Sequence, residues 1–469
     1  MNKGKEYVKN TAILLFGKFS TQIISFLLIP LYTYKLATEN YGYIDLIQTY
    51  ISLLSPIILL QLDSAVFRYL IDIRDKKEEK SKVISSSFWC VIFILLVSIC
   101  IFLLINIFIK IKYYKYIVFN MIAMVLNMYA MSIARGNGHN KSYAISSIIS
   151  SCITLLINLF LIIIFKFDAK SILIAATISN AVSFGYIFTK EKIKDHISAK
   201  YFNKKILKDL LKYSIPMIPN VLSWWIVGLS DRTIIVNFIG VAANGIYSIS
   251  CKFSNLLNSV FSIFNMSWQE TASIHINDED ASTFFSNMII NIYNLFVIIS
   301  CLIIGFLPVA FNIAIGENYM EAYQYIPILL IGNICSVLVG LFGGIYVAKK
   351  MTKKVATTTI LSAIINVGIN LLFVKKIGLY AACISTLISY FAMVIYRYYD
   401  INKIIKINIY TKKSLIYLIG FLILLIPYYL KKEIISVIAS LLLIVVYLMD
   451  NRKFVLGVLL NVIQRKNKN

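Results

Sequence analysis

The chain has 469 residues, of which 59% are hydrophobic and only 14% are charged. A soluble protein of this length needs several domains with polar surfaces and about a quarter of charged residues, so the composition excludes a soluble enzyme and predicts a multi-pass membrane protein. The net charge of +24 does not indicate nucleic-acid binding, because the basic residues lie in short runs between apolar stretches, as they do in cytosolic loops beside anionic lipid.

Apolar stretches long enough to cross a bilayer follow one another from the N-terminus to the C-terminus. About 20 mainly apolar residues are needed for one helical span. The first stretch follows Lys3, Lys5 and Lys9 without a small-residue cleavage site, so we expect an uncleaved span rather than a signal peptide. Fourteen spans are predicted, at about 11–36, 42–66, 83–108, 116–134, 143–165, 171–189, 213–239, 242–267, 283–308, 324–347, 355–374, 378–398, 413–430 and 433–450. For the last pair a re-entrant hairpin is the alternative.

The distribution of Lys and Arg predicts the orientation of the chain. These residues concentrate in the segments that are cytosolic if the N-terminus is inside, and an even number of spans then places the C-terminus inside as well. We therefore expect both termini in the cytoplasm.

A basic segment at 190–212 separates the sixth predicted span from the seventh, and it contains eight lysines. Within it, Ile206, Leu207, Leu210 and Leu211 share one face of a predicted helix, opposite three of the lysines (204, 205 and 208). The pattern fits an interfacial helix on the anionic inner leaflet, or a solvated cytosolic linker with ordinary positive-inside bias.

An internal repeat relates the two halves of the chain. Residues 141–160 and 353–372 share eight identities in twenty positions, and Ala175–Ser179 matches Ala381–Ser385 at a similar offset. Spans five and six therefore recur as eleven and twelve, which predicts two parallel six-helix lobes. The predicted domains are an N-terminal lobe (1–189), a basic cytosolic linker (190–212), a C-terminal lobe (213–398), and two extra helices with a basic tail (399–469).

Ionisable residues inside the predicted spans are the strongest functional signal, because each costs about 2.5–3.5 kcal/mol at mid-bilayer unless it faces water or a partner. Lys18, Arg232 and Lys252 are predicted to line a water-filled cleft and to bind the substrate. Polar residues on the same helical faces are predicted to line the cleft as well: Gln22, Asp45, Gln48, Asn220, Trp224, Asp231, Ser248, Asn255 and Ser259. The alternative for the uncharged members is that Ser and Asn join neighbouring helices.

The positive net charge of the predicted cleft favours an anionic substrate. Three cationic side chains stand against Asp45 and Asp231, whereas a site for lipophilic cationic drugs would be acidic. Phosphate or pyrophosphate suits such a cleft, because guanidinium and ammonium groups bind their oxygens. No catalytic residues are predicted. The cysteines and histidines lack metal-ligand spacing, so neither a metal site nor a cofactor is expected.

A set of short motifs stands at the opening of the second half, with counterparts in the first half. These are Lys212–Pro216, Asp231-Arg232-Thr233-Ile234-Ile235, Gly240 and Gly245-Ile246-Tyr247-Ser248, and Pro30-Leu31-Tyr32 and Tyr41-Gly42-Tyr43. The set resembles the Wzx-type oligosaccharide flippases of the multidrug/oligosaccharidyl-lipid/polysaccharide exporter superfamily.

This resemblance implies an all-α fold of about fourteen transmembrane helices, with two MATE-like lobes and two extra helices. It implies transport of undecaprenyl-diphosphate-linked oligosaccharide across the plasma membrane for O-antigen or capsule synthesis, with Lys18, Arg232 and Lys252 holding the diphosphate. We expect a monomeric transporter that works beside glycan polymerase machinery. Na⁺, H⁺ or the membrane potential remains open as the energy source. Trp225 and Asn265 join Trp224 and Asn255 as candidates for contact with the sugar.

Three alternatives stay open. A peptidoglycan-precursor flippase shares the cationic cleft. A drug/cation antiporter of the same superfamily needs exchangeable carboxylates, of which spans one and seven offer only Asp231. A membrane glycosyltransferase or polysaccharide polymerase usually needs a large extramembrane loop, which the predicted outer loops do not provide.

Overall fold

The computed structural model describes residues 20–409 and 411–451, and these residues are mainly helical. They form two compact units, which divide after Ser248. Unit 1 holds a helix over residues 20–35 and then α2 (Thr38–Ile58), α3 (Leu62–Asp72), α4 (Lys77–Phe108), α5 (Tyr114–Gly136), α6 (Asn140–Leu159), η1 (Phe160–Ile164), α7 (Lys170–Lys190), α8 (Ile193–His196), η2 (Ala199–Tyr201), α9 (Lys204–Ser214), η3 (Ile215–Met217), α10 (Ile218–Phe238) and the start of α11 (Val241–His275).

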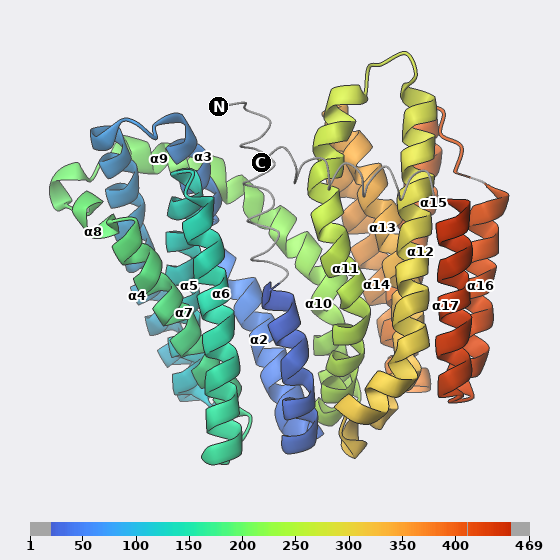
Figure 1. Ribbon diagram of the computed structural model, residues 1–469. Helices are drawn as coiled ribbons and strands as arrows, with labels where there is room; N and C mark the ends of the chain where they lie inside the picture. Colours follow the sequence, from blue (N-terminus) through green and yellow to red (C-terminus); the bar gives the residue numbers. More distant parts are fainter. Residues whose placement is uncertain (1–19, 410, 452–469) are drawn as a thin grey trace, which may run out of the picture. The chain divides into compact units, whose positions relative to one another are not determined.

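Unit 2 begins inside α11 and follows the chain to its end (Figure 1). Its other elements are α12 (Ala281–Ala314), η4 (Glu317–Tyr325), α13 (Ile326–Ala348), α14 (Thr352–Ile377), α15 (Leu379–Asn402), α16 (Lys412–Tyr429) and α17 (Glu433–Asp450). The compact units thus divide later than the basic segment 190–212, because α10 packs against α2 of unit 1. The predicted lobe boundaries were derived from the sequence repeat, whereas the two compact units are defined by contacts. The lobe boundaries therefore stay predictions.

The chain is an all-α multi-pass membrane protein. Ten helices in the described part of the chain are long and apolar enough to span a bilayer, and the bent pair α2–α3 would make eleven. The first predicted span lies partly outside the described residues, and α10 and α11 are not among the ten. The total of fourteen spans therefore stays a prediction.

The second predicted span is not one straight helix. Its helices α2 and α3 meet at 49° around Leu60 and Gln61, both of which have positive φ angles (50° and 55°). Such angles are uncommon for residues other than glycine. Hydropathy could not predict this bend, because the residues on both sides of it are apolar.

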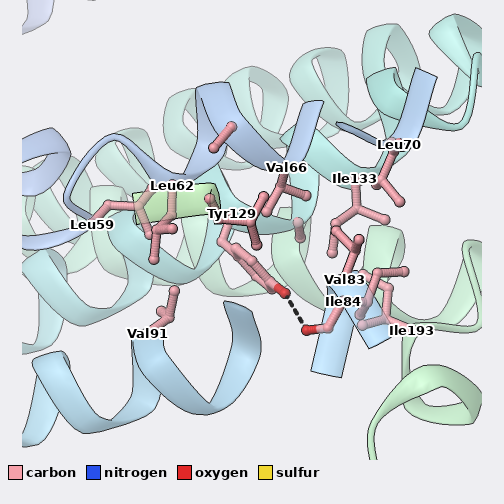
Figure 2. Packing of buried hydrophobic residues seen from close by; sticks show 14 of the residues in the cluster. Leu59, Leu62, Val66, Leu70, Val83, Ile84, Val91, Tyr129, Ile133 and Ile193 are labelled. Carbon is pink, nitrogen blue, oxygen red and sulfur yellow. Dashed lines mark hydrogen bonds between the residues drawn. The ribbon is translucent and has the colours of Figure 1, made fainter. Parts of the chain in front are cut away.

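The hydrophobic core of unit 1 joins α3, α4 and α5. Figure 2 shows Leu62 and Val66 of α3 packed with Ile84 and Tyr129, and the phenol of Tyr129 donates a hydrogen bond of 2.9 Å to the carbonyl oxygen of Ile84. Tyr129 is 1% exposed, so this bond satisfies a polar group that would be costly to bury alone.

Helix α9 confirms the predicted amphipathic segment and shows what covers its apolar face. Leu210 is fully buried, and Ile206 and Leu211 pack against the core cluster of unit 1. In Figure 1, α9 lies at the same end of unit 1 as α3, and it contacts both α3 and α4. Lys204, Lys205 and Lys208 are exposed on the opposite face. Protein therefore covers these apolar side chains, and the choice between a cytosolic linker and an interfacial helix stays a prediction.

The predicted repeat has a structural counterpart in each unit. Helices α6 and α7 pack together in unit 1, and α14 and α15 pack together in unit 2. Asn158 and its repeat equivalent Asn370 are both 0% exposed. The shared asparagines thus occupy equally buried positions, as expected for repeated helix pairs.

A buried arginine joins three helices of unit 2. Arg397 of α15 is 1% exposed and donates hydrogen bonds to the carbonyl oxygen of Val339 (2.8 Å, α13) and to Oγ1 of Thr358 (2.8 Å, α14). We expect Arg397→Met to lower the free energy of unfolding by about 2–3 kcal/mol, because it leaves buried acceptors without a donor. Thermal unfolding of the purified protein measures this loss.

The matched control is Arg68→Met. Arg68 makes an exposed ion pair with Asp72 one turn away on α3, and such pairs contribute little. An equal loss of stability in both variants would contradict a specific role for Arg397.

Candidate functional site

A network of charged and polar side chains links α2, α10 and α11 within unit 1. Arg232 of α10 donates from Nε to Oδ2 of Asp45 on α2 at 2.7 Å. Oγ of Ser248 on α11 donates to the other oxygen of that carboxylate, Oδ1, at 2.6 Å. Asp45 therefore bridges two helices that follow it by nearly 200 residues in the chain. We call Asp45, Asp231, Arg232, Tyr247 and Ser248 the charged network.

The second carboxylate of the network is also engaged. The phenol of Tyr247 donates to Oδ2 of Asp231 at 2.9 Å, and the guanidinium carbon of Arg232 lies 6.0 Å from the centre of the Tyr247 ring. Asp231 and Tyr247 are each 2% exposed. Neighbouring Asp231 and Arg232 thus point to different partners, which is one of the two arrangements that their spacing of about 100° on a helix allows.

Burial makes the ion pair consequential. The side chains of Arg232 and Asp45 are 9% and 15% exposed. Removing the partner of a buried charge strongly destabilises the folded protein, whereas an exposed ion pair contributes little to its stability. Each charge of this pair therefore constrains where the other can lie.

Two glycines allow the helices of the network to approach closely. A methyl group on Gly42 of α2 would lie 2.1 Å from the carbonyl oxygen of Val241, and one on Gly245 of α11 would lie 2.3 Å from that of Thr38. Nδ2 of Asn244 donates to the carbonyl oxygen of Gly42 at 2.8 Å in the same contact. Backbone therefore packs directly on backbone at the first turns of α2 and α11.

The glycine contact follows the predicted repeat. Gly42 and Gly245 are 203 residues apart, and so are the hydrogen-bonded Asp45 and Ser248. The predicted period of six spans makes spans two and eight repeat partners, and the network joins these two spans. By the predicted orientation, these first turns lie at the outer side of the membrane.

The described structure brings together four of the predicted site residues, Asp45, Asp231, Arg232 and Ser248, in this network. Gln48 follows Asp45 by one turn of α2, and its Oε1 accepts a long hydrogen bond of 3.4 Å from Nδ2 of Asn120. Gln22 is half-buried. Lys18 lies outside the described residues, and the structure does not describe the side chains of Asn220 and Trp224 on α10.

The remaining predicted residues lie further along α11, in unit 2. Lys252 is half-buried one turn after Ser248, Asn255 is exposed, and Ser259 donates to the carbonyl oxygen of Asn255 at 3.0 Å. Because α11 is one unbroken helix, these positions share a face with Ser248, as predicted. The bond of Ser259 stays within its own helix, so Ser259 does not join α11 to a neighbouring helix in this way.

Three aromatic side chains extend the site, and of these only Trp225 was predicted to contact the substrate. Tyr50 of α2 shares a hydrogen bond of 2.9 Å with Oγ1 of Thr233, and Nε1 of Trp225 donates to the carbonyl oxygen of Thr49 at 3.2 Å. Trp225, a candidate for sugar contact, thus joins α10 to α2 in this state. Tyr247 belongs to the motif Gly245–Ser248, and its phenol donates a hydrogen bond to Asp231 on α10. This contact between two helices could not be predicted from the periodicity of either helix.

Comparisons with known proteins agree with this fold. The family model described as polysaccharide biosynthesis protein matches residues 7–269, which is more than half of the chain and includes the charged network. An uncharacterized membrane protein of Methanocaldococcus jannaschii is 22% identical over 253 residues, 52% of this chain and 50% of that protein. The chain therefore spans about half the length of this curated relative.

Solved structures are similar over most of the chain. A lipid II flippase, MurJ, in an inward closed conformation has a TM-score of 0.71 at 16% identity and covers 95% of this chain and 100% of its own. An inward-facing multidrug resistance MATE family transporter of the MOP superfamily has a TM-score of 0.67 at 17% identity, with 81% and 95% coverage. A MOP superfamily transporter from Pyrococcus furiosus, reported with a reversed polarity of its binding pocket, has a TM-score of 0.60 at 14% identity, with 85% and 96% coverage.

The chain belongs to the polysaccharide biosynthesis protein family, and its fold is that of the MurJ and MATE structures.

Proposed function

We propose that this member of the polysaccharide biosynthesis protein family moves undecaprenyl-diphosphate-linked oligosaccharide repeat units from the inner to the outer leaflet of the bacterial plasma membrane, for O-antigen or capsule synthesis. The observation that supports the proposal best is the buried Arg232–Asp45 pair, which lies inside the segment that the family model matches. A guanidinium group that binds a carboxylate can also bind a diphosphate, because phosphate oxygens bind arginine in the same forked geometry.

The proposed mechanism is an exchange of partners at Arg232. In the described state Asp45 holds Arg232 and Ser248 together and closes the first turns of α2 on α10 and α11. A diphosphate that binds Arg232 removes this attraction and favours separation of the helices. The substrate thereby shifts the equilibrium between two states, by as much as its affinity for them differs.

Two further cations extend the proposed site. Lys252 follows Ser248 by four residues, which is about 6 Å along the helix, and it is assigned to the second phosphate. Lys18 is assigned the same role from the first predicted span. The lipid tail stays in the bilayer while the head group crosses.

A peptidoglycan-precursor flippase is the second candidate, and the similarity to a lipid II flippase over the whole of that chain favours it. The charged network does not separate the two, since both substrates carry a diphosphate. A cation/drug antiporter fits less well, because Asp45 and Asp231 both accept hydrogen bonds from Arg232, Ser248 or Tyr247. The polymerase or glycosyltransferase alternative, from another class, does not fit a transporter fold.

Lys252→Ala tests the proposed site in cells. We expect it to abolish surface polysaccharide while the abundance of the protein in the membrane stays normal, because the diphosphate loses one of its cations. The matched control is Lys376→Ala, which removes an exposed lysine at the end of α14 and should leave the polysaccharide unchanged. Wild-type polysaccharide in the Lys252 variant would remove that lysine from the site.

A further inference from the structure

The connection between α4 and α5 gathers three lysines and three tyrosines around one open hollow. Lys110, Lys112, Lys115, Tyr113, Tyr114 and Tyr116 line it, its volume is about 580 Å³, and none of its lining residues is acidic. Hollows lined only by basic, aromatic and neutral side chains favour anions.

Tertiary contacts hold this connection in place. The phenol of Tyr113 donates to Oδ2 of Asp168 at 2.7 Å, and the phenol of Tyr43 on α2 donates to the carbonyl oxygen of Lys112 at 3.1 Å. Nζ of Lys112 lies 5.0 Å from the centre of the Tyr113 ring. The backbone that carries the other lysines is therefore anchored to α2 and to Asp168, two residues before α7.

Three polar groups of the hollow make no hydrogen bond to the residues that the structure describes. Lys110 and Lys115 are exposed, and neither makes a hydrogen bond or ion pair to the residues that the structure describes. The phenol oxygen of Tyr114 is buried and likewise has no hydrogen-bond partner in the described part of the chain. Buried polar groups are normally paired, and Tyr114 lines the same hollow as the two lysines, so all three groups are available to a ligand of the hollow.

The surface beside the hollow is apolar. Ile107, Phe108 and Ile109, at the end of α4, are 71%, 84% and 65% exposed. In a membrane protein such residues contact acyl chains, and Lys and Tyr side chains beside them reach the head-group layer. A ligand that fits both surfaces has an anionic head and a hydrocarbon tail.

We propose that this hollow binds the phosphate group of an anionic phospholipid. Lys110 and Lys115 contact the phosphate oxygens, Tyr114 donates its hydroxyl to one of them, and the acyl chain lies along Ile107, Phe108 and Ile109. The exposed apolar residues favour a membrane lipid over a free phosphate. By the predicted orientation the site faces the outer leaflet, where the positive-inside rule makes three lysines in six residues uncommon. The site shares no residue with the charged network. The proposal therefore does not depend on which substrate the protein carries.

Native mass spectrometry of the full chain in phosphatidylcholine nanodiscs, titrated with phosphatidylglycerol, tests the proposal. We expect Lys110→Gln with Lys115→Gln to weaken retention of phosphatidylglycerol about tenfold or more, since each lysine near the surface contributes about 1 kcal/mol. The matched control is Lys431→Gln with Lys432→Gln, an exposed pair at the turn between α16 and α17, which should leave retention unchanged. No change in the first variant, or equal changes in both, would overturn the proposal.

Two further measurements separate the parts of the site. Tyr114→Phe removes only a hydroxyl that has no hydrogen-bond partner among the described residues, so the variant should fold normally and weaken retention about fivefold. Unchanged retention would exclude Tyr114. Inorganic pyrophosphate alone should compete poorly, because it has no tail; competition as effective as that of the lipid itself would overturn the assignment to a phospholipid.

Discussion

Asp45→Ala is expected to lower the free energy of unfolding by about 3–5 kcal/mol, the cost of leaving one charge of a buried ion pair unpaired. The change leaves Arg232, which is 7% exposed, without its carboxylate and removes the acceptor of Ser248. Thermal unfolding of the purified protein measures the loss. Asp72→Ala, which breaks the exposed pair with Arg68, is the matched control and should have little effect.

A double-mutant cycle separates the pair from the rest of the network. Arg232→Leu alone leaves Asp45 unpaired, whereas the two changes together remove both charges. The double variant should therefore be more stable than the sum of the single losses predicts, by at least 1 kcal/mol or so. Simple additivity would show that Asp45 and Arg232 do not depend on each other.

Gly245→Val should have a comparably large effect through sterics alone. Its Cβ would lie 2.3 Å from the carbonyl oxygen of Thr38, and neither backbone can move without separating α2 from α11. We expect a loss of at least 3 kcal/mol in stability, since overpacking of this kind typically costs about 1–3 kcal/mol even where side chains can adjust. Under the proposed function the variant should also lose surface polysaccharide.

Gly185→Ala is the control for this change. A methyl group there meets no atom within 4 Å, and alanine is the better helix former. It should be neutral or slightly stabilising. If Gly245→Val were tolerated as well as Gly185→Ala, the close contact of α2 with α11 would not be required for folding.

Hydropathy and repeat patterns predicted much of the fold, because both depend on residue type and spacing. Long apolar runs predicted the helices, and Asn158 and Asn370 marked repeated positions that prove equally buried. The bend at Leu60 and Gln61 escaped prediction, since backbone angles there follow from tertiary packing rather than from apolarity.

The candidate site was predicted in part for the same reason. A charge in an apolar run is costly wherever it lies, so Asp45, Asp231 and Arg232 could be singled out without a structure. Their pairing could not be foreseen, because Asp45 and Arg232 lie 187 residues apart and the periodicity of one helix says nothing about its neighbours. In the described state Arg232 binds the carboxylate of Asp45, and its role in substrate binding stays a prediction.

Translocation in proteoliposomes tests the central claim most directly. Purified protein is reconstituted with undecaprenyl-diphosphate-linked oligosaccharide, and an impermeant glycosidase measures how much sugar faces outward over time. Wild-type protein should bring the inner-leaflet sugar within reach of the enzyme, and Arg232→Ala should leave it protected, as in protein-free liposomes. Equal rates for wild-type and protein-free liposomes, or full activity of Arg232→Ala, would contradict a transporter that grips the diphosphate through this arginine.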